Sequence, residues 1–374
     1  FILLIVGIIY FVKTKRILDN ANSITNTIGL GMVGILVVFI GTYYYENPID
    51  YSKSYFSDIP YAANDIPIKP DIYLMIFDEY AGNISLKNNF DYDNTDFLKK
   101  LQSIGFYVPE ISYSNYPNTD LSLPSTFNMG YLDFLTEELG KDSRDRRLVQ
   151  ELRDNNLMMK VLKLHGYKIT SFYGGLGAVG NTNLVSEKLC SFGTINTDLR
   201  KNLVLTYLPI SYFNTVLLEL HQKEKLECMF SILPEIKGSE ETPVFVLGQF
   251  RLPHEPFIYD SEGNLIKTEK HFTDKEAYLE QLIYSSKKIL ELVDKILENT
   301  TRDPVIIVMS DHGYRAEIDW KNPSNEHYVA GFNNLAAYHM PNQMDNLPET
   351  ISSVNIFRII FNSYLDTDFE MLED

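Results

Sequence analysis

Three metal-type ligands follow two apolar runs that lie far apart in the sequence. Asp78 comes directly after the run at residues 72–77. Asp311 and His312 come directly after the run at 305–310. Carboxylates and imidazole are ligands that zinc and manganese accept in proteins. The two segments therefore predict half of a metal site, and a metal there could polarise a phosphoryl or sulfuryl ester.

An oxygen nucleophile would complete such a site, and the polar segment at residues 114–122 could supply one. This segment precedes a stretch that could be helical. A threonine at the start of a helix faces the positive end of the helix dipole, where an alkoxide and an incoming anion are both favoured. Thr119 could be that nucleophile or an ordinary helix N-cap, and Ser122 and Ser125 are its rivals.

Secondary structure elements must bring these segments together. Both apolar runs have the length and the β-branched or aromatic content of strands that are buried on both faces. Parallel strands end at the same edge of a sheet, where α/β proteins bind ligands. Elsewhere, helices are expected at 94–104, 144–164, 203–230 and 276–299, and strands at 105–108, 165–170 and 243–250. This alternation predicts one three-layer α/β/α sandwich with a mostly parallel central sheet.

Four motifs in a fixed order resemble those of a known superfamily. They are Asp78, Thr119, the segment Pro-His-Glu-Pro-Phe at 253–257, and Ser-Asp-His-Gly at 310–313. Together they resemble the alkaline phosphatase superfamily, in particular its membrane-anchored sulfatase-like branch, which includes lipoteichoic acid synthases and phosphoethanolamine transferases. The similarity spans about residues 70–360. The same fold class, α/β with N-terminal transmembrane helices, is what this resemblance implies.

The resemblance also implies roles for individual residues. Asp78, Thr119, Asp311 and His312 would bind one divalent metal ion, zinc or manganese, and the Thr119 hydroxyl would be the attacking group. His254 would contact the transferred group or donate a proton to the leaving oxygen.

Two further residues are candidates for substrate binding. Arg315 could add a second positive contact, although a structural or surface arginine is the simpler interpretation. His327 lies on the segment after the second apolar run and could reach the rim of the site. Glu79, next to Asp78, could be a further ligand, but a supporting or solvated role fits it better.

The reaction implied is a metal-dependent phosphoester hydrolysis or phospho-group transfer outside the cytoplasm. Thr119 would take the phosphoryl group as a covalent ester and release it to water or to an acceptor alcohol. The substrate could be lipid-linked or an envelope glycan. Alternatives are a sulfuric ester hydrolase and a catalytically silent domain that binds an envelope component or a partner.

Several departures from related sequences limit these alternatives. Neither Cys190 nor Cys228 lies in the Cys-x-Pro-x-Arg context of formylglycine sulfatases, which argues against sulfatase activity. An Asp-x-x-x-His pair for a second metal is not found ahead of Asp311, so one metal is expected. Related sequences often have a histidine a few residues before the Pro-His segment, where this chain has Gly248, Gln249 and Phe250. The two cysteines could pair or remain separate buried thiols.

Two apolar stretches near the N-terminus predict a membrane region. Residues 1–12 are almost wholly apolar, and residues 28–45 carry no charge. We expect two transmembrane helices within 1–45, the first truncated, then an extracytoplasmic linker at 46–70 and the catalytic domain at 71–374. A cleaved signal peptide is the alternative for the second stretch, but its length favours a spanning helix.

Charge sets the orientation and excludes one class of partner. Lys13, Lys15 and Arg16 place the short loop between the two apolar stretches in the cytoplasm, so that the catalytic domain lies outside a multi-pass cell membrane protein. The net charge of -17 argues against nucleic acid binding. An anionic substrate therefore needs a local positive centre, and a bound metal ion would supply it.

Overall fold

The computed structural model describes residues 19–56, 69–172, 179–180, 182–190, 211–266, 273–343 and 347–373. The chain divides into two compact units, Phe1–Lys53 and Ser54–Asp374.

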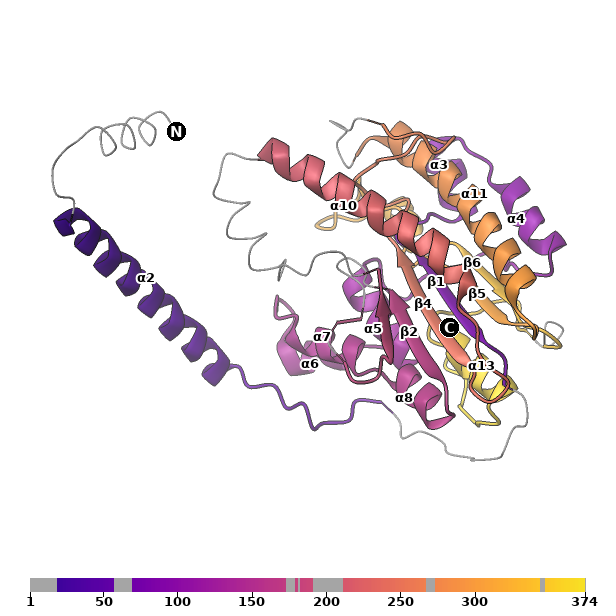
Figure 1. Ribbon diagram of the computed structural model, residues 1–374, viewed down its shortest axis with the longest axis horizontal. Coiled ribbons are helices and arrows are strands. Elements are labelled where there is room, and N and C mark those ends of the chain that lie inside the picture. Colours follow the sequence, from indigo (N-terminus) through magenta and orange to yellow (C-terminus); the bar gives the residue numbers. More distant parts are fainter. Residues whose placement is uncertain are drawn as a thin grey trace. The chain divides into compact units, whose positions relative to one another are not determined.

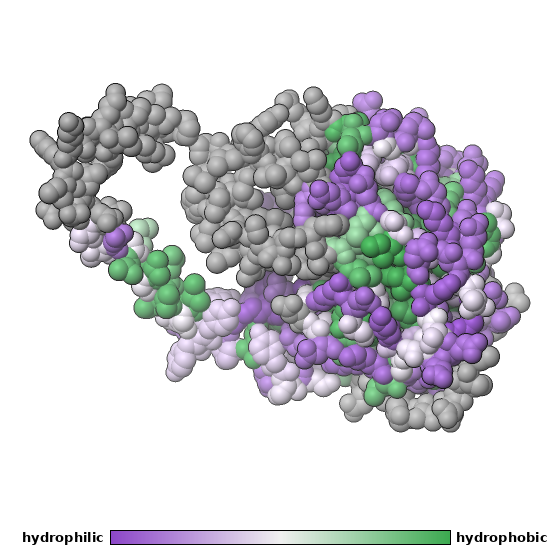
Figure 2. All heavy atoms as spheres, in the orientation of Figure 1, coloured by the Kyte–Doolittle hydropathy of each residue, from purple (hydrophilic) through white to green (hydrophobic). Residues whose placement is uncertain are grey.

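The first unit contains one described helix, α2 (Asp19–Glu46). Its segment Asn26–Glu46 is long and apolar enough to cross a membrane, and none of it is buried inside the protein. Figure 2 shows hydrophobic residues along this helix. The Thr42 hydroxyl donates a hydrogen bond to the carbonyl of Val38, so this polar group is satisfied within the helix itself. The first expected helix, at 1–12, and the cationic loop after it lie outside the described residues.

A six-stranded sheet forms the centre of the second unit. Its order is β3-β2-β4-β1-β5-β6, and β6 is antiparallel to β5 while the other strand pairs are parallel. The strands are β1 (Ile72–Phe77), β2 (Lys168–Phe172), β3 (Glu187–Leu189), β4 (Val244–Phe250), β5 (Val305–Met309) and β6 (Ala336–His339). The mostly parallel α/β fold predicted from the sequence is confirmed. Because β1 lies between β4 and β5 and all three are parallel, the segments that follow them meet at the carboxyl end of the sheet.

Strand β1 separates two hydrophobic cores. Tyr73, Met75 and Phe77 belong to one core, and the alternate residues Ile72, Leu74 and Ile76 belong to the other. The first core is covered by α3 (Asn83–Phe90), α4 (Thr95–Ser103), α10 (Ser211–Ile232) and α11 (Lys275–Asn299). The second is covered by α5 (Thr119–Asn128), α8 (Leu157–Leu164) and α13 (Ile356–Tyr364). Figure 1 shows these two helical layers on opposite sides of the sheet.

Three shorter helices complete the part of the fold that positions the site. They are α6 (Phe134–Leu139), α7 (Arg147–Asp154) and α12 (Asn325–Phe332).

Two of the expected elements differ in the structure, strand β3 was not expected, and residues 203–210 of the expected helix at 203–230 lie outside the described residues. The single helix expected at 144–164 is two helices, because Asn156 adopts an extended backbone and its side chain accepts a hydrogen bond from the backbone of Met159, which begins α8. The strand expected at 105–108 is only an isolated bridge between Tyr107 and Tyr338.

One question that the sequence left open is answered by a disulfide. Cys190 follows β3 and is bonded to Cys228 in α10. The disulfide therefore links the segment after β3, the outermost strand of the sheet, to α10.

Candidate active site

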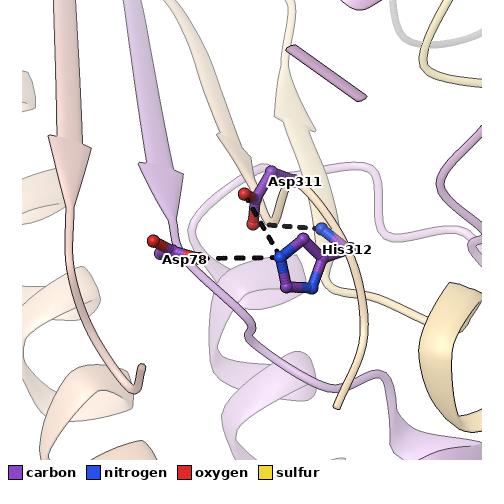
Figure 3. Close-up of side chains that lie close together, drawn as sticks. All are labelled: Asp78, Asp311 and His312. Atoms are coloured by element: carbon purple, nitrogen blue, oxygen red, sulfur yellow. Dashed lines mark hydrogen bonds and ion pairs between the residues drawn. The ribbon is translucent and has the colours of Figure 1, made fainter. Parts of the chain in front are cut away.

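Asp78, Asp311 and His312 meet at the edge where β1 and β5 end. The Nε2 atom of His312 lies 3.7 Å from Oδ1 of Asp78 and 3.6 Å from Oδ2 of Asp311. One ligand atom from each residue falls within 4.8 Å of the others. Figure 3 shows both carboxylates beside the imidazole. The parallel pairing of β1 with β5 produces this convergence, because Asp78 directly follows β1 and Asp311 and His312 lie within three residues of the end of β5.

Thr119 completes the group. Its Oγ1 donates a hydrogen bond to Oδ2 of Asp311 at 2.6 Å and lies 3.4 Å from Nε2 of His312. Thr119 is the first residue of α5, and the N-cap is Asn118, whose side chain accepts a hydrogen bond from the backbone of Leu121. The Thr119 hydroxyl is therefore not used in capping and is directed to the ligands.

The two rival hydroxyls are used elsewhere. Ser122 donates to the backbone carbonyl of Asp311 at 2.6 Å, and Ser125 donates to the carbonyl of Gly130 at 2.8 Å. Both serines are fully buried. Of the three candidates, only Thr119 lines the cavity described below.

The donor set fits a divalent cation. A backbone carbonyl can only accept, so Nδ1 of His312 donates to the carbonyl of Gly313 at 2.8 Å. Nε2 is thereby directed to the two carboxylates, and it could join them as a ligand of a cation bound among them. Oδ1 of Asp78 is buried without a hydrogen-bond partner among the described residues. Burial, and then the charge of Asp311, raise the pKa of the Asp78 carboxyl well above its usual value.

Backbone groups hold Asp311 in place. Its Oδ1 accepts hydrogen bonds from the backbone N–H groups of Glu79 at 3.1 Å and His312 at 3.0 Å. Oδ2 remains directed to Thr119 and His312. The hydrogen bonds to Oδ1 thus orient the Asp311 carboxylate, and Oδ2 is available to a metal ion.

His254 lies on the wall of the same site. Its backbone N–H donates to the carbonyl of Asp78 at 3.2 Å, and its Nδ1 donates to the carbonyl of Glu255 at 2.8 Å. Its Nε2 lies 3.7 Å from Oε2 of Glu79. The other oxygen of Glu79 accepts a hydrogen bond from the backbone of Arg315. Glu79 therefore has a supporting position between His254 and the segment after β5.

A cavity of about 970 Å³ opens beside this group, and Asp311 and His312 are buried behind its wall. Among the site residues expected from sequence, Asp78, Thr119, His254 and Arg315 line it. His327 is not among the described residues that line it. Its Nδ1 accepts a hydrogen bond from the backbone of Ser324, and the two residues form the capping box of α12. The His327 ring is thus used in capping α12, and its contact with substrate stays a prediction.

The cavity is also lined by polar and aromatic residues to which the sequence assigned no role in binding substrate. These are Lys141, Arg144, Gln249, Arg251 and Trp320. Gln249 and Arg251 could have been found from their place at the end of the expected strand at 243–250. No periodic pattern marks the other three.

Comparisons with known proteins support the superfamily. The sulfatase family model matches residues 72–345, which is well over half of the chain. A search of curated proteins finds no match.

Two solved structures share the fold. The C-terminal periplasmic domain of EcEptC from Escherichia coli in complex with Zn is 10% identical, with a TM-score of 0.50, and the match covers 84% of this chain and 88% of that one. The integral membrane protein lipooligosaccharide phosphoethanolamine transferase A (EptA) from Neisseria meningitidis is 14% identical, with a TM-score of 0.50, and the match covers 91% of this chain and 62% of that one. The resemblance drawn from the four motifs is confirmed, and the chain belongs to the sulfatase family of the alkaline phosphatase superfamily.

Proposed function

We propose that the protein is a metal-dependent, extracytoplasmic phosphoester hydrolase or phospho-group transferase with Thr119 as its nucleophile. The observation that carries this proposal is the position of the Thr119 hydroxyl, 2.6 Å from Oδ2 of Asp311 and beside the imidazole of His312. An oxygen nucleophile in contact with metal-type ligands at the start of a helix is suited to attack on an anionic ester.

One divalent ion, zinc or manganese, would be held by Asp78, Thr119, Asp311 and His312. When bound, it would lower the pKa of the threonine hydroxyl and neutralise charge that develops on the phosphoryl oxygens. The residues supply hard oxygen ligands and one imidazole, which suits either ion.

The protein groups then have separate tasks. The Thr119 oxygen forms a bond to phosphorus, its proton passes to water in the cavity, and the bond from phosphorus to the leaving oxygen breaks. Protonated His254, on the cavity wall, gives its proton to that leaving oxygen. In the second half, water or an acceptor alcohol attacks the phosphothreonine, and His254 takes the proton of the attacking group. The bond from phosphorus to the Thr119 oxygen breaks, and that oxygen regains a proton from water in the cavity.

The location outside the cytoplasm rests on two features. The segment Asn26–Glu46 has the length and composition of a membrane span. The bond between Cys190 and Cys228 is typical of oxidising compartments. We infer a multi-pass cell membrane protein, with a membrane region at 1–45, a linker at 46–70 and a catalytic domain at 71–374. Such an anchor would keep the site near lipid-linked or envelope-glycan phosphoesters.

The test is mass spectrometry of the metal-loaded full chain after brief exposure to phosphoesters and, separately, to sulfate esters. A phosphoryl adduct is expected on Thr119, and it should be absent from Thr119→Ala. Thr119→Ser keeps the hydroxyl and should still form the adduct. An adduct on another residue would contradict the mechanism. A wild-type protein that binds metal but forms no adduct and turns over no ester would favour the silent binding domain.

A further inference from the structure

The cavity is much larger than a transferred phosphoryl group requires. At about 970 Å³ it is near the upper end of the range for sites that enclose a whole small molecule. Asp78, Thr119 and His254 account for only part of its wall. The remaining wall must therefore contact the part of the substrate that is not transferred.

A basic turn forms one portion of that wall. Lys141, Arg144, Arg146 and Arg147 fall within the short connection between α6 and the start of α7. The chain as a whole is acidic, with 33 basic and 50 acidic residues. A local run of basic residues in such a chain creates a positive field that attracts anions.

Two of these four cations are already neutralised. Arg146 is 2.7 Å from Asp120, and Arg147 is 2.6 Å from Asp145. The first ion pair also fixes the turn beside α5, because Asp120 immediately follows Thr119. The basic turn is therefore held next to the helix that presents the proposed nucleophile.

The other two cations remain available. Lys141 and Arg144 both line the cavity and are exposed to solvent. Within the described parts of the chain, neither side chain makes an ion pair or a hydrogen bond. Among the described residues, the one cavity-lining carboxylate outside the metal centre and the two ion pairs is Asp133, so positive charge exceeds negative charge on this part of the wall.

We propose that Lys141 and Arg144 form a second anion-binding subsite, which takes a phosphate group on the non-transferred part of the substrate. The inference rests on the proposed function and narrows its substrate class to phosphoesters that carry a second phosphate. The apolar side chains Leu135, Leu139 and Trp320 line the same cavity and would contact the segment between the two phosphates.

Anion binding without metal is the first test. The full chain is stripped with EDTA, which leaves the carboxylates of the metal centre to repel phosphate, and is then titrated with inorganic phosphate. Trp320 is the single tryptophan of the chain and lines the cavity, so its fluorescence reports binding there. The wild type is expected to show a saturable change. The double variant Lys141→Gln/Arg144→Gln should weaken binding at least fivefold.

A matched control separates this subsite from general electrostatics. Lys99→Gln/Lys100→Gln removes the same charge from exposed positions on α4, outside the cavity lining. It should leave phosphate binding within twofold of the wild type. Unchanged binding in the Lys141/Arg144 variant, or an equal loss in the control, would overturn the proposal. All four side chains are exposed, so the variants should fold.

Metal-loaded protein provides the second test. Phenyl phosphate carries one phosphate, whereas 1,4-phenylene bisphosphate and 4,4′-biphenylene bisphosphate carry two at different spacings. The Lys141/Arg144 variant should raise KM about tenfold for at least one bisphosphate and leave kcat and the KM for phenyl phosphate within twofold. If neither bisphosphate responds, the subsite is absent. A Thr119 adduct that still forms from phenyl phosphate would show that the proposed function survives that failure.

Discussion

Oγ1 of Thr119 lies 2.6 Å from Oδ2 of Asp311, although 192 residues separate them in the sequence. Two different elements supply the two atoms. Thr119 begins α5, which packs on one face of the sheet. Asp311 lies just after β5, which is one of the strands of that sheet. The pair therefore depends on how accurately the start of α5 is placed over the end of β5.

Asn118 is predicted to maintain that placement. Asn118→Ala removes the side chain that accepts from the backbone of Leu121, which should cost about 1 kcal/mol in the free energy of unfolding. It should also lower kcat at least tenfold, because a small displacement of a reacting group strongly reduces the rate. Asn118→Ser keeps a capping oxygen and should recover most of kcat. Denaturant unfolding and steady-state kinetics measure the two effects.

Asn156→Ala is the matched control. Asn156 caps α8 in the same way, by accepting a hydrogen bond from the backbone of Met159. The Asn156→Ala variant should lose a similar free energy of unfolding, and its kcat should be unchanged. Equal losses of kcat in both alanine variants would mean that stability, and not the placement of Thr119, controls the rate.

The sequence predicted half of this site for a simple reason. Asp78 and Asp311 directly follow short apolar runs, and a buried strand with a polar residue at its end is a local pattern that needs no knowledge of the rest of the fold. The nucleophile was harder to identify. Whether Thr119 caps the helix or faces the ligands depends on Asn118, and only the three-dimensional placement of α5 shows that Ser122 and Ser125 have other partners.

Other features could not be read from a local pattern. The pairing of Cys190 with Cys228 requires β3 and α10 to be neighbours, and the sequence does not specify strand order. Lys141 and Arg144 belong to an aperiodic polar turn, and their common cavity forms only when that turn packs beside α5. By contrast, the helix break at Asn156 had a sequence signal, because asparagine favours helix starts.

Asp78→Asn should stabilise the metal-free protein. Burial, and then the charge of Asp311, raise the pKa of Asp78 in the folded state. A raised carboxyl pKa means that the folded protein holds the proton more tightly, so its stability falls as pH rises from the unfolded-state pKa through the folded one. An amide cannot ionise and avoids this loss. At neutral pH the metal-free variant should be more stable by on the order of 1 kcal/mol, measured by thermal unfolding in EDTA.

Adding zinc or manganese should make the wild type more stable than Asp78→Asn. The wild type gains stability in proportion to the logarithm of metal concentration above Kd, and the variant should lose most of this gain because it lacks one charged ligand. Asp71→Asn is the control, since Asp71 is also buried but accepts hydrogen bonds from the backbone of Gly238 and Val244. That variant should be less stable with or without metal. Equal metal stabilisation of Asp78→Asn and the wild type would exclude Asp78 as a ligand.

His254→Ala should affect substrates according to their leaving groups. If His254 protonates the leaving oxygen, an alkyl phosphoester should lose about 100-fold or more in kcat. A nitrophenyl ester should lose much less, because nitrophenolate leaves without a proton. The ratio of the two kcat values, measured with metal present, is the readout.

His339→Ala serves as the comparison for that ratio. His339 donates a hydrogen bond from Nδ1 to the carbonyl of Pro304. It is not among the described residues that line the cavity. Its variant should leave the leaving-group ratio unchanged even if stability falls. A loss that is the same for both leaving groups in His254→Ala would assign His254 to binding and not to proton transfer.

Gln249 is predicted to contact the substrate directly. It lines the cavity, pairs in register with Ile76 near Asp78, and is about nine-tenths buried. Its Oε1 has no hydrogen-bond partner among the described residues. The preceding residues of the same strand face, Phe245 and Leu247, belong to the hydrophobic core, so the polar group comes where the strand leaves that core and enters the cavity.

Gln249→Leu therefore should separate activity from stability. Leucine removes a buried polar atom that lacks a partner, so the free energy of unfolding should stay the same or rise. The value of kcat/KM should fall about tenfold, which corresponds to roughly 1.4 kcal/mol of lost interaction in the transition state. Gln281→Leu is the contrasting variant, because Gln281 is buried with hydrogen bonds to the backbone of Ile258 and Pro253, and its loss should destabilise the fold. Full activity in Gln249→Leu would show that the amide faces the cavity without touching the substrate.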